Sequence, residues 1–496
     1  MTVAQPLLTR DVRGLTELSL AEFARRCSDR LDAGARLVTL IGRPDDAGKK
    51  DVVVTAVVAP VSGELEVMRA RAACGERYEA LTARHPAAQI YERELWEQTG
   101  LIPEGHPWLK PVRFEGERQQ RMAEYPFFKV RGQEVHEVGV GPIHAGVIEP
   151  GHFRFMCLGE KVHHLEIQLG YQHRGVEALL LQRPPMALAP VVESICGDSC
   201  VAYASAYCAA VEALSGTPVG FETEVSRGVG LEMERITMHV ATLNGLATDI
   251  AFLQGTGTYG RLRTAVINAS QRVCGNRFGR NWVRPGRARA LNEALRQDLK
   301  QTLSDFARDL AGMNDLMCAA LSVKARFRGT GVVSTKAAQD LGLLGLPARA
   351  SGVAVDTRSQ LPGRLYDRLP IELQVESSGD CWARMLVRMR EIDASLAWLF
   401  RVLDDTSLDL DKGNGVAVPG TSLRPETLCV SLVEGVRGQI VQVLETSARG
   451  DLLHYKVQDP SLPNWFGLAL AVRNNGISDF PICNKSFDLS YCGNDL

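Results

Sequence analysis

Two short motifs near the middle of the chain constrain its fold more than any other feature of the sequence. The first is Arg174-Gly-Val-Glu177, and the second is Glu193-Ser-Ile-Cys-Gly-Asp-Ser-Cys200. If the segment after Gly197 is helical, Cys196 and Cys200 lie about one turn apart on the same helix face. Two sulfurs in this arrangement can reach one ion, so the spacing indicates a candidate cofactor-binding site.

Composition and charge exclude several classes of protein. The chain has 496 residues, enough for roughly two to four domains. Its 56 Lys and Arg against 58 Asp and Glu give a net charge of −2, without the basic excess of a nucleic-acid-binding protein. It has no apolar run long enough to span a bilayer and no signal-peptide core at its start. We therefore expect a cytoplasmic chain that reaches the inner or plasma membrane only through partner subunits, and no nucleic-acid partner.

The cysteines and glycines argue against an iron-sulfur protein and against an NAD enzyme. Twelve cysteines in so long a chain are expected to be reduced, buried thiols. No Cys-x-x-Cys-x-x-Cys run is present, so we expect no iron-sulfur cluster in this chain. Gly255-Thr-Gly-Thr-Tyr-Gly260 has the letters of a dinucleotide-binding loop, but it follows a helical pattern rather than a strand. We interpret it as a helix-ending loop, which disfavours a freestanding NAD enzyme.

The first part of the chain predicts a small α+β domain at 15–121, after an N-terminal tail at 1–14. Local apolar patterns predict its elements: a helix over 20–31 and strands over 36–41 and 52–58. The charged run at 115–121 is the predicted linker to the next domain.

Residues 122–496 predict a second, larger domain that is mostly helical. It begins with a β-rich stretch over 127–158, and its last β segment begins at Val433. Long apolar periodicity over 198–254 predicts helices between these two stretches. The predicted fold class of the whole chain is therefore α+β.

Several motifs, in chain order, resemble those of known families. Glu92-Arg-Glu94, followed by Gly100 and Gly105-His-Pro107, resembles the C-type subunit of respiratory complex I. From about residue 122 the chain resembles the D-type (49-kDa-type) subunit of complex I and the large subunit of energy-converting nickel-iron hydrogenases. Fusion of the two parts is typical of formate-hydrogenlyase and hydrogenase-4-like large subunits. The residues themselves predict a charged helix that ends at Gly100, followed by a Pro/Gly turn.

The resemblance also implies where a nickel-iron centre would be bound. Such a centre needs four thiolates, two from a Cys-Gly-x-Cys motif and two from a C-terminal Asp-Pro-Cys-x-x-Cys motif. Cys196 matches the first ligand, whereas Ser199, Ser490 and Gly493 stand at the other three positions. We therefore expect these degenerate positions to hold no nickel-iron centre.

Two cysteines lie one residue out of register with the family ligands, and they leave an alternative open. These are Cys200 and Cys492. A displaced four-sulfur metal site could be formed by Cys196, Cys200, Cys483 and Cys492, although the spacing of the last two is uncommon for a metal site.

Four further residues carry functional roles that the resemblance implies. Glu149 matches the family glutamate that relays protons, and Glu177 matches the glutamate near a magnesium site. The alternatives are a solvated turn for Glu149 and a cap or a salt bridge to Arg174 for Glu177. In complex I the equivalent cavity holds a quinone head group, and His144 and Tyr203 lie in the neighbourhoods of its ligands without matching them residue for residue.

The resemblance implies a function inside a complex. The chain would pass electrons between the iron-sulfur cluster of a small subunit and an acceptor, with a quinone as the leading candidate, while Glu149 moves protons. A ferredoxin-like iron-sulfur subunit and antiporter-like membrane subunits are further implied partners. Two alternatives remain: an active hydrogenase or formate hydrogenlyase large subunit with unorthodox metal ligands, and a non-catalytic coupling or assembly subunit.

Overall fold

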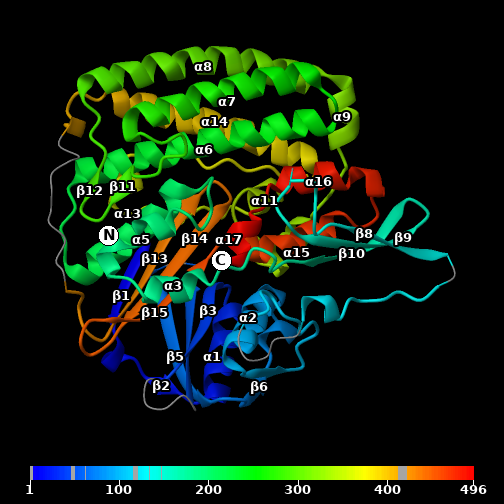
Figure 1. Cartoon of the computed structure of the whole chain (residues 1–496), viewed down its shortest axis with the longest axis vertical. Coiled ribbons are helices and arrows are strands. Elements are labelled where there is room, and N and C mark those ends of the chain that lie inside the picture. Colours follow the sequence, from blue (N-terminus) through cyan, green and yellow to red (C-terminus); the bar gives the residue numbers. More distant parts are fainter. Residues whose placement is uncertain are drawn as a thin grey trace.

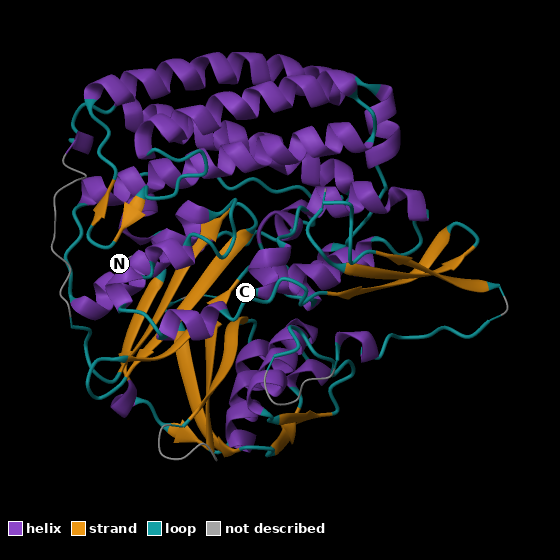
Figure 2. Ribbon diagram, in the orientation of Figure 1, coloured by secondary structure: helices purple, strands orange, loops and turns teal. Residues whose placement is uncertain are grey.

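The protein folds into three stacked parts, which Figures 1 and 2 show from one side. The computed structural model describes residues 4–45, 51–61, 63–115, 121–132, 134–146, 148–411 and 422–496. An N-terminal α+β unit lies at one end, a layer of long helices at the other, and an antiparallel sheet between them. The predicted α+β fold class is confirmed. The predicted linker lies largely outside the described residues, so the domain boundary stays a prediction.

The N-terminal unit packs two helices against a sheet of four strands in the order β2-β5-β4-β3. Its elements are β2 (Glu17–Leu18), α1 (Leu20–Asp32), β3 (Arg36–Pro44), β4 (Asp51–Ala59), β5 (Glu66–Ala73), β6 (Arg77–Glu79), α2 (Gln89–Thr99) and β7 (Ile102–Glu104). The predicted helix and strands of this unit are confirmed. Helix α2 ends at Gly100, whose φ of 84° is a left-handed conformation that glycine adopts without a Cβ penalty.

The central sheet joins the two ends of the chain. Its strand order is β1-β13-β14-β15, and all neighbours are antiparallel. The strands are β1 (Leu7–Asp11), β13 (Thr427–Gly435), β14 (Gly438–Thr446) and β15 (Leu452–Gln458). The sequence predicted a tail at 1–14, but β1 pairs with β13 and Leu7 lies opposite Ser431. This pairing satisfies the backbone N–H and C=O groups along the edge of β13. The local sequence around residues 7–11 does not indicate it, because the partner strand lies at the other end of the chain.

The N-terminal sheet and the central sheet share a hydrophobic core. Val38, Ile41 and Val57 of the first sheet cluster with Val430 and Val443 of the second. The N-terminal unit is therefore packed against the larger domain through apolar contacts, and this fixes α2 relative to the C-terminal strands.

The helical layer contains four long helices, and α6 is buried on most of its surface. The long helices are α6 (Phe221–Asp249), α7 (Leu253–Cys274), α8 (Glu293–Ala319) and α14 (Cys381–Asp404). Within α6, a Cβ atom at Gly230 would lie 2.9 Å from Nε1 of Trp282. This glycine lets the indole ring pack directly on the helix backbone.

The glycine-rich segment 255–260 is not a helix-ending loop, as the sequence suggested, but the first turns of α7. A Cβ atom at Gly255 would lie 2.8 Å from Cβ of Ala247, so packing at the α6–α7 turn favours a glycine here. Tertiary contacts override the weak helix propensity of glycine.

Shorter elements complete the larger domain. A three-stranded sheet ordered β10-β9-β8 projects to one side of the body (Figure 1). Its strands are β8 (Val135–Val140), β9 (His152–Leu158) and β10 (Lys161–Gln168). The other elements are α3 (Val176–Leu181), α4 (Ala189–Val192), α5 (Cys200–Ser215), β11 (Val283–Arg284), β12 (Arg287–Ala288), α9 (Leu321–Phe327), α10 (Thr335–Asp340), α11 (Gly345–Ala350), α12 (Thr357–Gln360), α13 (Gly363–Arg368), α15 (Ser461–Ala471), α16 (Phe480–Phe487) and α17 (Tyr491–Asp495). In the described ranges, no helix has the length and apolar character needed to cross a membrane.

Candidate functional site

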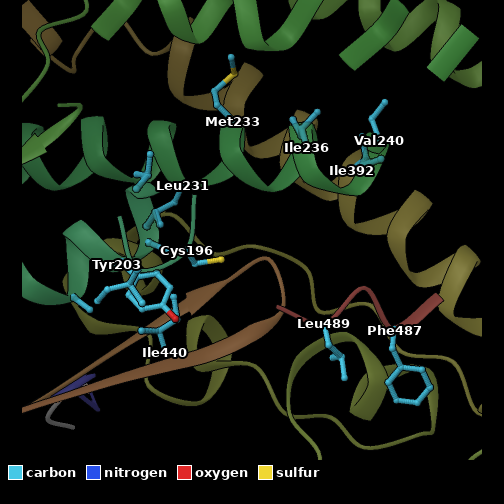
Figure 3. Close-up of a cluster of buried hydrophobic side chains, with 14 of the residues drawn as sticks. Cys196, Tyr203, Leu231, Met233, Ile236, Val240, Ile392, Ile440, Phe487 and Leu489 are labelled. Carbon is cyan, nitrogen blue, oxygen red and sulfur yellow. The ribbon is translucent and has the colours of Figure 1, made fainter. Parts of the chain in front are cut away.

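The start of α5 and the C-terminal segment meet in the interior, and they bring two cysteines together. Cys196 lies in the turn before α5, and Ser490 and Cys492 lie at the start of α17. Sγ of Cys196 is 3.1 Å from Oγ of Ser490, which in turn is 3.5 Å from Sγ of Cys492. Figure 3 shows Cys196 beside Tyr203 in the hydrophobic core above β14. Cys196 is buried, whereas Cys492 is partly exposed.

An ion pair lies directly beside these sulfurs. Arg437, in the turn between β13 and β14, donates from Nη1 and Nη2 to the Asp198 carboxylate at 2.8 and 2.9 Å. Its Nη1 is also 3.4 Å from Oγ of Ser199 and 4.0 Å from Sγ of Cys196. Burial alone would raise the pKa of Asp198, but the charge and hydrogen bonds of Arg437 outweigh it and lower this pKa. The carboxylate therefore stays ionised.

The two thiols both contact Oγ of Ser490, and they differ in acidity. The bond to Cys492, together with burial, raises the pKa of Cys196 well above its ordinary value. The same bond lowers the pKa of Cys492, because it stabilises the thiolate against the cost of burial. The site therefore contains one protected thiol and one thiol that ionises more readily.

Glu149 and His144 are both partly exposed. The partly exposed Glu149 carboxyl is within hydrogen-bonding reach of Cys492. His144 is in the β8–β9 connection, where its Nε2 lies 2.9 Å from the carbonyl oxygen of Gly151. The structure thus brings Glu149, Cys196, Ser199, Ser490 and Cys492 into one site.

Tyr203 lies next to this site but does not face open space. It is fully buried, and its hydroxyl donates to Oδ2 of Asp459. The hydroxyl proton of Tyr203 is already donated to Asp459, so it is not available to a quinone. Tyr203 therefore packs behind the thiols and does not act as a quinone ligand.

Glu177 has a different partner from the one suggested by the sequence. Its carboxylate accepts from the backbone N–H of Val457 at 2.9 Å and lies 3.1 Å from Nζ of Lys456. Arg174 instead donates to the carbonyl oxygens of Ser194 and Ile195. The alternative of an Arg174–Glu177 salt bridge is therefore wrong, because the Arg174 guanidinium is bonded to the turn that precedes Cys196.

Lys456 makes this second cluster unsuited to magnesium. The buried ammonium also lies 2.7 Å from Oε1 of Glu94, which pairs in addition with Arg113. Burial lowers the pKa of Lys456, but the two carboxylates outweigh it and raise this pKa, so the ammonium stays charged. Since a protein cation already neutralises Glu177, the residues present do not fit a divalent ion.

The remaining cysteines of the displaced four-sulfur alternative do not join the site. Cys200 turns its Sγ toward the carbonyl oxygens of Glu193 and Gly197, and burial raises its pKa to about 12. Cys483 is the hydrogen-bond partner of Cys381, at the start of α14. Among the described residues, no group of three or more His, Cys, Asp or Glu side chains could hold a metal ion. The four-sulfur arrangement is therefore not formed.

The donor set at the family's metal position also does not fit a nickel-iron centre. Only Cys196 and Cys492 supply sulfur, and Ser199 and Ser490 supply hydroxyl groups where soft thiolates are required. The guanidinium group of Arg437 lies against the same atoms and brings a competing positive charge.

Three residues of the thiol site and of the Glu177 cluster were not predicted from the sequence: Asp198, Arg437 and Lys456. Arg437 stands in a short turn before Gly438, and its charge beside a tight turn was a usable signal. Lys456 is a single lysine in a strand, and no local pattern distinguishes it from an exposed one.

Two protein families match separate parts of the chain. The 30 Kd subunit family of respiratory-chain NADH dehydrogenase matches residues 17–127, and the 49 Kd subunit family matches residues 249–417. Formate hydrogenlyase subunit 5 of Escherichia coli K12 is 29% identical over 444 residues, covering 84% of this chain and 77% of that protein. The C/D subunit of NADH-quinone oxidoreductase from Bacteroides thetaiotaomicron is 26% identical over 449 residues, covering 82% of each. Membrane-bound hydrogenase subunit alpha of Pyrococcus furiosus is 26% identical over 364 residues, covering 71% of this chain and 85% of that protein.

The chain is a fusion of a C-type and a D-type region of the complex I kind. It is homologous to formate hydrogenlyase subunit 5, to hydrogenase-4 component G and to the C/D subunit of NADH-quinone oxidoreductase, in agreement with the resemblance seen in its motifs.

Proposed function

We propose that this chain is the large subunit of a membrane-associated redox complex that works without a nickel-iron centre. It passes electrons between the iron-sulfur cluster of a partner subunit and an acceptor at the Glu149–Cys492 face. The observation that carries the proposal is the make-up of the family's metal position. Two sulfurs, two hydroxyl groups and the Arg437–Asp198 ion pair meet there, in place of four thiolates.

Glu149 is the group that we assign to proton transfer. Its carboxyl is partly exposed and contacts Cys492, so it can exchange protons with solvent on one side and with the site on the other. A carboxyl placed in this way serves as a general acid or base.

A quinone-like molecule is the leading acceptor. His144 is partly exposed, and because its Nε2 lies against the carbonyl oxygen of Gly151, its Nδ1 is the nitrogen that we assign to a carbonyl oxygen of such a ring. Tyr203 is not part of this proposal, because its hydroxyl is bonded to Asp459.

Homology to subunits of hydrogenase and complex I-type complexes supports the partners that we propose. We propose an iron-sulfur small subunit facing the thiol site, a ferredoxin-like iron-sulfur subunit, and antiporter-like membrane subunits. The chain would then lie on the cytoplasmic side, peripheral to the membrane.

The test is turnover of the purified complex with a soluble quinone analogue, for the wild type and for Glu149→Gln. Loss of a general acid-base group should lower turnover about 10²-fold or more. Glu160→Gln removes an exposed carboxylate in the β9–β10 turn and serves as the matched control. Unchanged turnover in Glu149→Gln would favour a non-catalytic coupling subunit.

Metal content separates the proposal from an active hydrogenase. Nickel and iron should be measured for the chain with and without its partner. We expect no nickel, with iron only in the presence of the iron-sulfur partner. Nearly one nickel per chain would overturn the proposal.

A further inference from the structure

We propose that Cys196 and Cys492 form a redox-active dithiol, which cycles between two thiols and a disulfide by exchange with a disulfide compound. This inference rests on the proposed function, because it gives the site a two-electron carrier made only of protein atoms. It is nevertheless measurable on the chain alone.

The geometry brings the two sulfurs to one hydroxyl group. Oγ of Ser490 lies 3.1 Å from Sγ of Cys196 and 3.5 Å from Sγ of Cys492, so both sulfurs contact the same atom. Cys196 comes from the turn before α5 and Cys492 from the last helix, so a bond between them would close across the site and not within one element.

The environment gives the two sulfurs different roles. Cys492 is partly exposed, so a disulfide compound can reach it, whereas Cys196 is 1% exposed. Because Cys492 is the sulfur that a disulfide compound can reach, it is the attacking thiolate, and Cys196 is then the resolving thiol. The guanidinium of Arg437, 4.0 Å from Sγ of Cys196, favours negative charge on that sulfur when it attacks.

The exchange balances without any further reactant. The Cys492 thiolate attacks one sulfur of the disulfide compound and releases the other half as a thiolate. The Cys196 thiol then attacks Sγ of Cys492 and gives its proton to a departing thiolate. The chain gains one S–S bond and loses two electrons, which reduce the compound to its two halves.

A second thiol pair in the same molecule provides an internal comparison. Sγ of Cys483 and Sγ of Cys381 lie 2.7 and 3.4 Å from the place that a Cβ atom at Gly331 would take, so they are close to each other, but both thiols are fully buried. A thiol pair that no disulfide compound can reach should stay reduced in the folded chain, so it reports on adventitious oxidation through unfolding.

The experiment is a redox titration of the purified full-length chain in buffers with varied ratios of oxidised to reduced dithiothreitol. The thiols are trapped by acid, alkylated and quantified by mass spectrometry. We expect the Cys196 and Cys492 peptides to lose alkylation together, in proportion to the ratio, and to appear as one cross-linked peptide. Cys492→Ser should abolish the cross-link, and Cys200→Ser, which removes a thiol with no thiol partner, should leave it unchanged.

Three results would overturn the inference. The first is alkylation of both peptides at every ratio. The second is equal cross-linking of Cys381 to Cys483, which would show oxidation of unfolded chains. The third is protection of Cys196 and Cys492 that a chelator removes, which would show a bound metal ion. Since no partner or quinone is present, failure here leaves the Glu149→Gln test of the complex unaffected.

Discussion

Nζ of Lys456 lies 2.7 Å from Oε1 of Glu94, so a buried ammonium group of the central sheet is paired with a carboxylate of the N-terminal unit. The same ammonium group pairs with Glu177, and this cluster joins the C-type and D-type regions where the family motifs of both meet. The cation beside Glu177 is therefore part of the interface between the two regions.

Replacing Lys456 with Met should destabilise this interface. The change leaves Glu94 and Glu177 buried without their shared cation, and breaking a buried ion pair costs about 3–5 kcal/mol. We expect a lower urea midpoint for the variant, and partial recovery when Glu177→Gln is added. Lys336→Met, at a lysine whose side chain is 82% exposed, is the control and should change stability by about 0.5 kcal/mol or less. A Lys456→Met midpoint equal to wild type would contradict the pairing.

Acid should weaken the contact between the N-terminal sheet and the central sheet through Glu445. Its buried carboxylate accepts from Arg43 and Arg69 at 2.7 and 2.8 Å. Burial would raise the pKa of Glu445, but the two arginines lower it to about 2. Because the folded pKa is below the unfolded value, this stabilisation is complete above about pH 4.3 and is lost as pH falls toward 2.

The variant Glu445→Gln tests whether this carboxylate makes the protein less stable as the pH falls. The single carboxylate should contribute about 3 kcal/mol at neutral pH. Unfolding midpoints measured between pH 6 and pH 3 should therefore fall less steeply in the variant than in the wild type. Parallel pH profiles would show that Glu445 does not carry the effect.

Gly230→Ala should destabilise the helical layer. A Cβ atom would lie 2.9 Å from Nε1 of the buried Trp282, and overpacking of this kind costs about 1–3 kcal/mol. Gly257→Ala in α7 is the matched control, because a Cβ atom there meets nothing within 4 Å. That variant should gain up to about 1 kcal/mol of helix stability. Thermal unfolding of both variants measures the difference, and a shift of the same sign in both would refute the packing argument.

His144 and Tyr203 should respond differently to mutation. If a quinone-like acceptor contacts His144, His144→Ala should raise KM for the analogue, whereas His163→Ala, at an exposed histidine of β10, should not. Tyr203→Phe should leave KM unchanged and lower stability by about 1–3 kcal/mol, because Asp459 loses a buried donor. A raised KM in Tyr203→Phe would restore this residue as a ligand.

Much of the fold followed from local patterns. The helix at 20–31, the strands at 36–41 and 52–58, and the end of α2 at Gly100 depend on side-chain spacing or on one glycine, so neighbouring residues are enough to predict them. The pairing of β1 with β13 was not predictable, since its hydrogen-bond partners lie at the other end of the chain.

The same division holds at the site. The sequence by itself determined the homology, the absence of cysteine at Ser199 and Ser490, and the presence of Glu149 and Cys196 in family positions. Only the tertiary structure decided that Cys492 and Cys196 meet at Ser490, that Sγ of Cys200 faces carbonyl oxygens of the segment before α5, and that Lys456 meets Glu177. Residue types set which contacts are chemically available, whereas the packing of distant elements decides which of those contacts form.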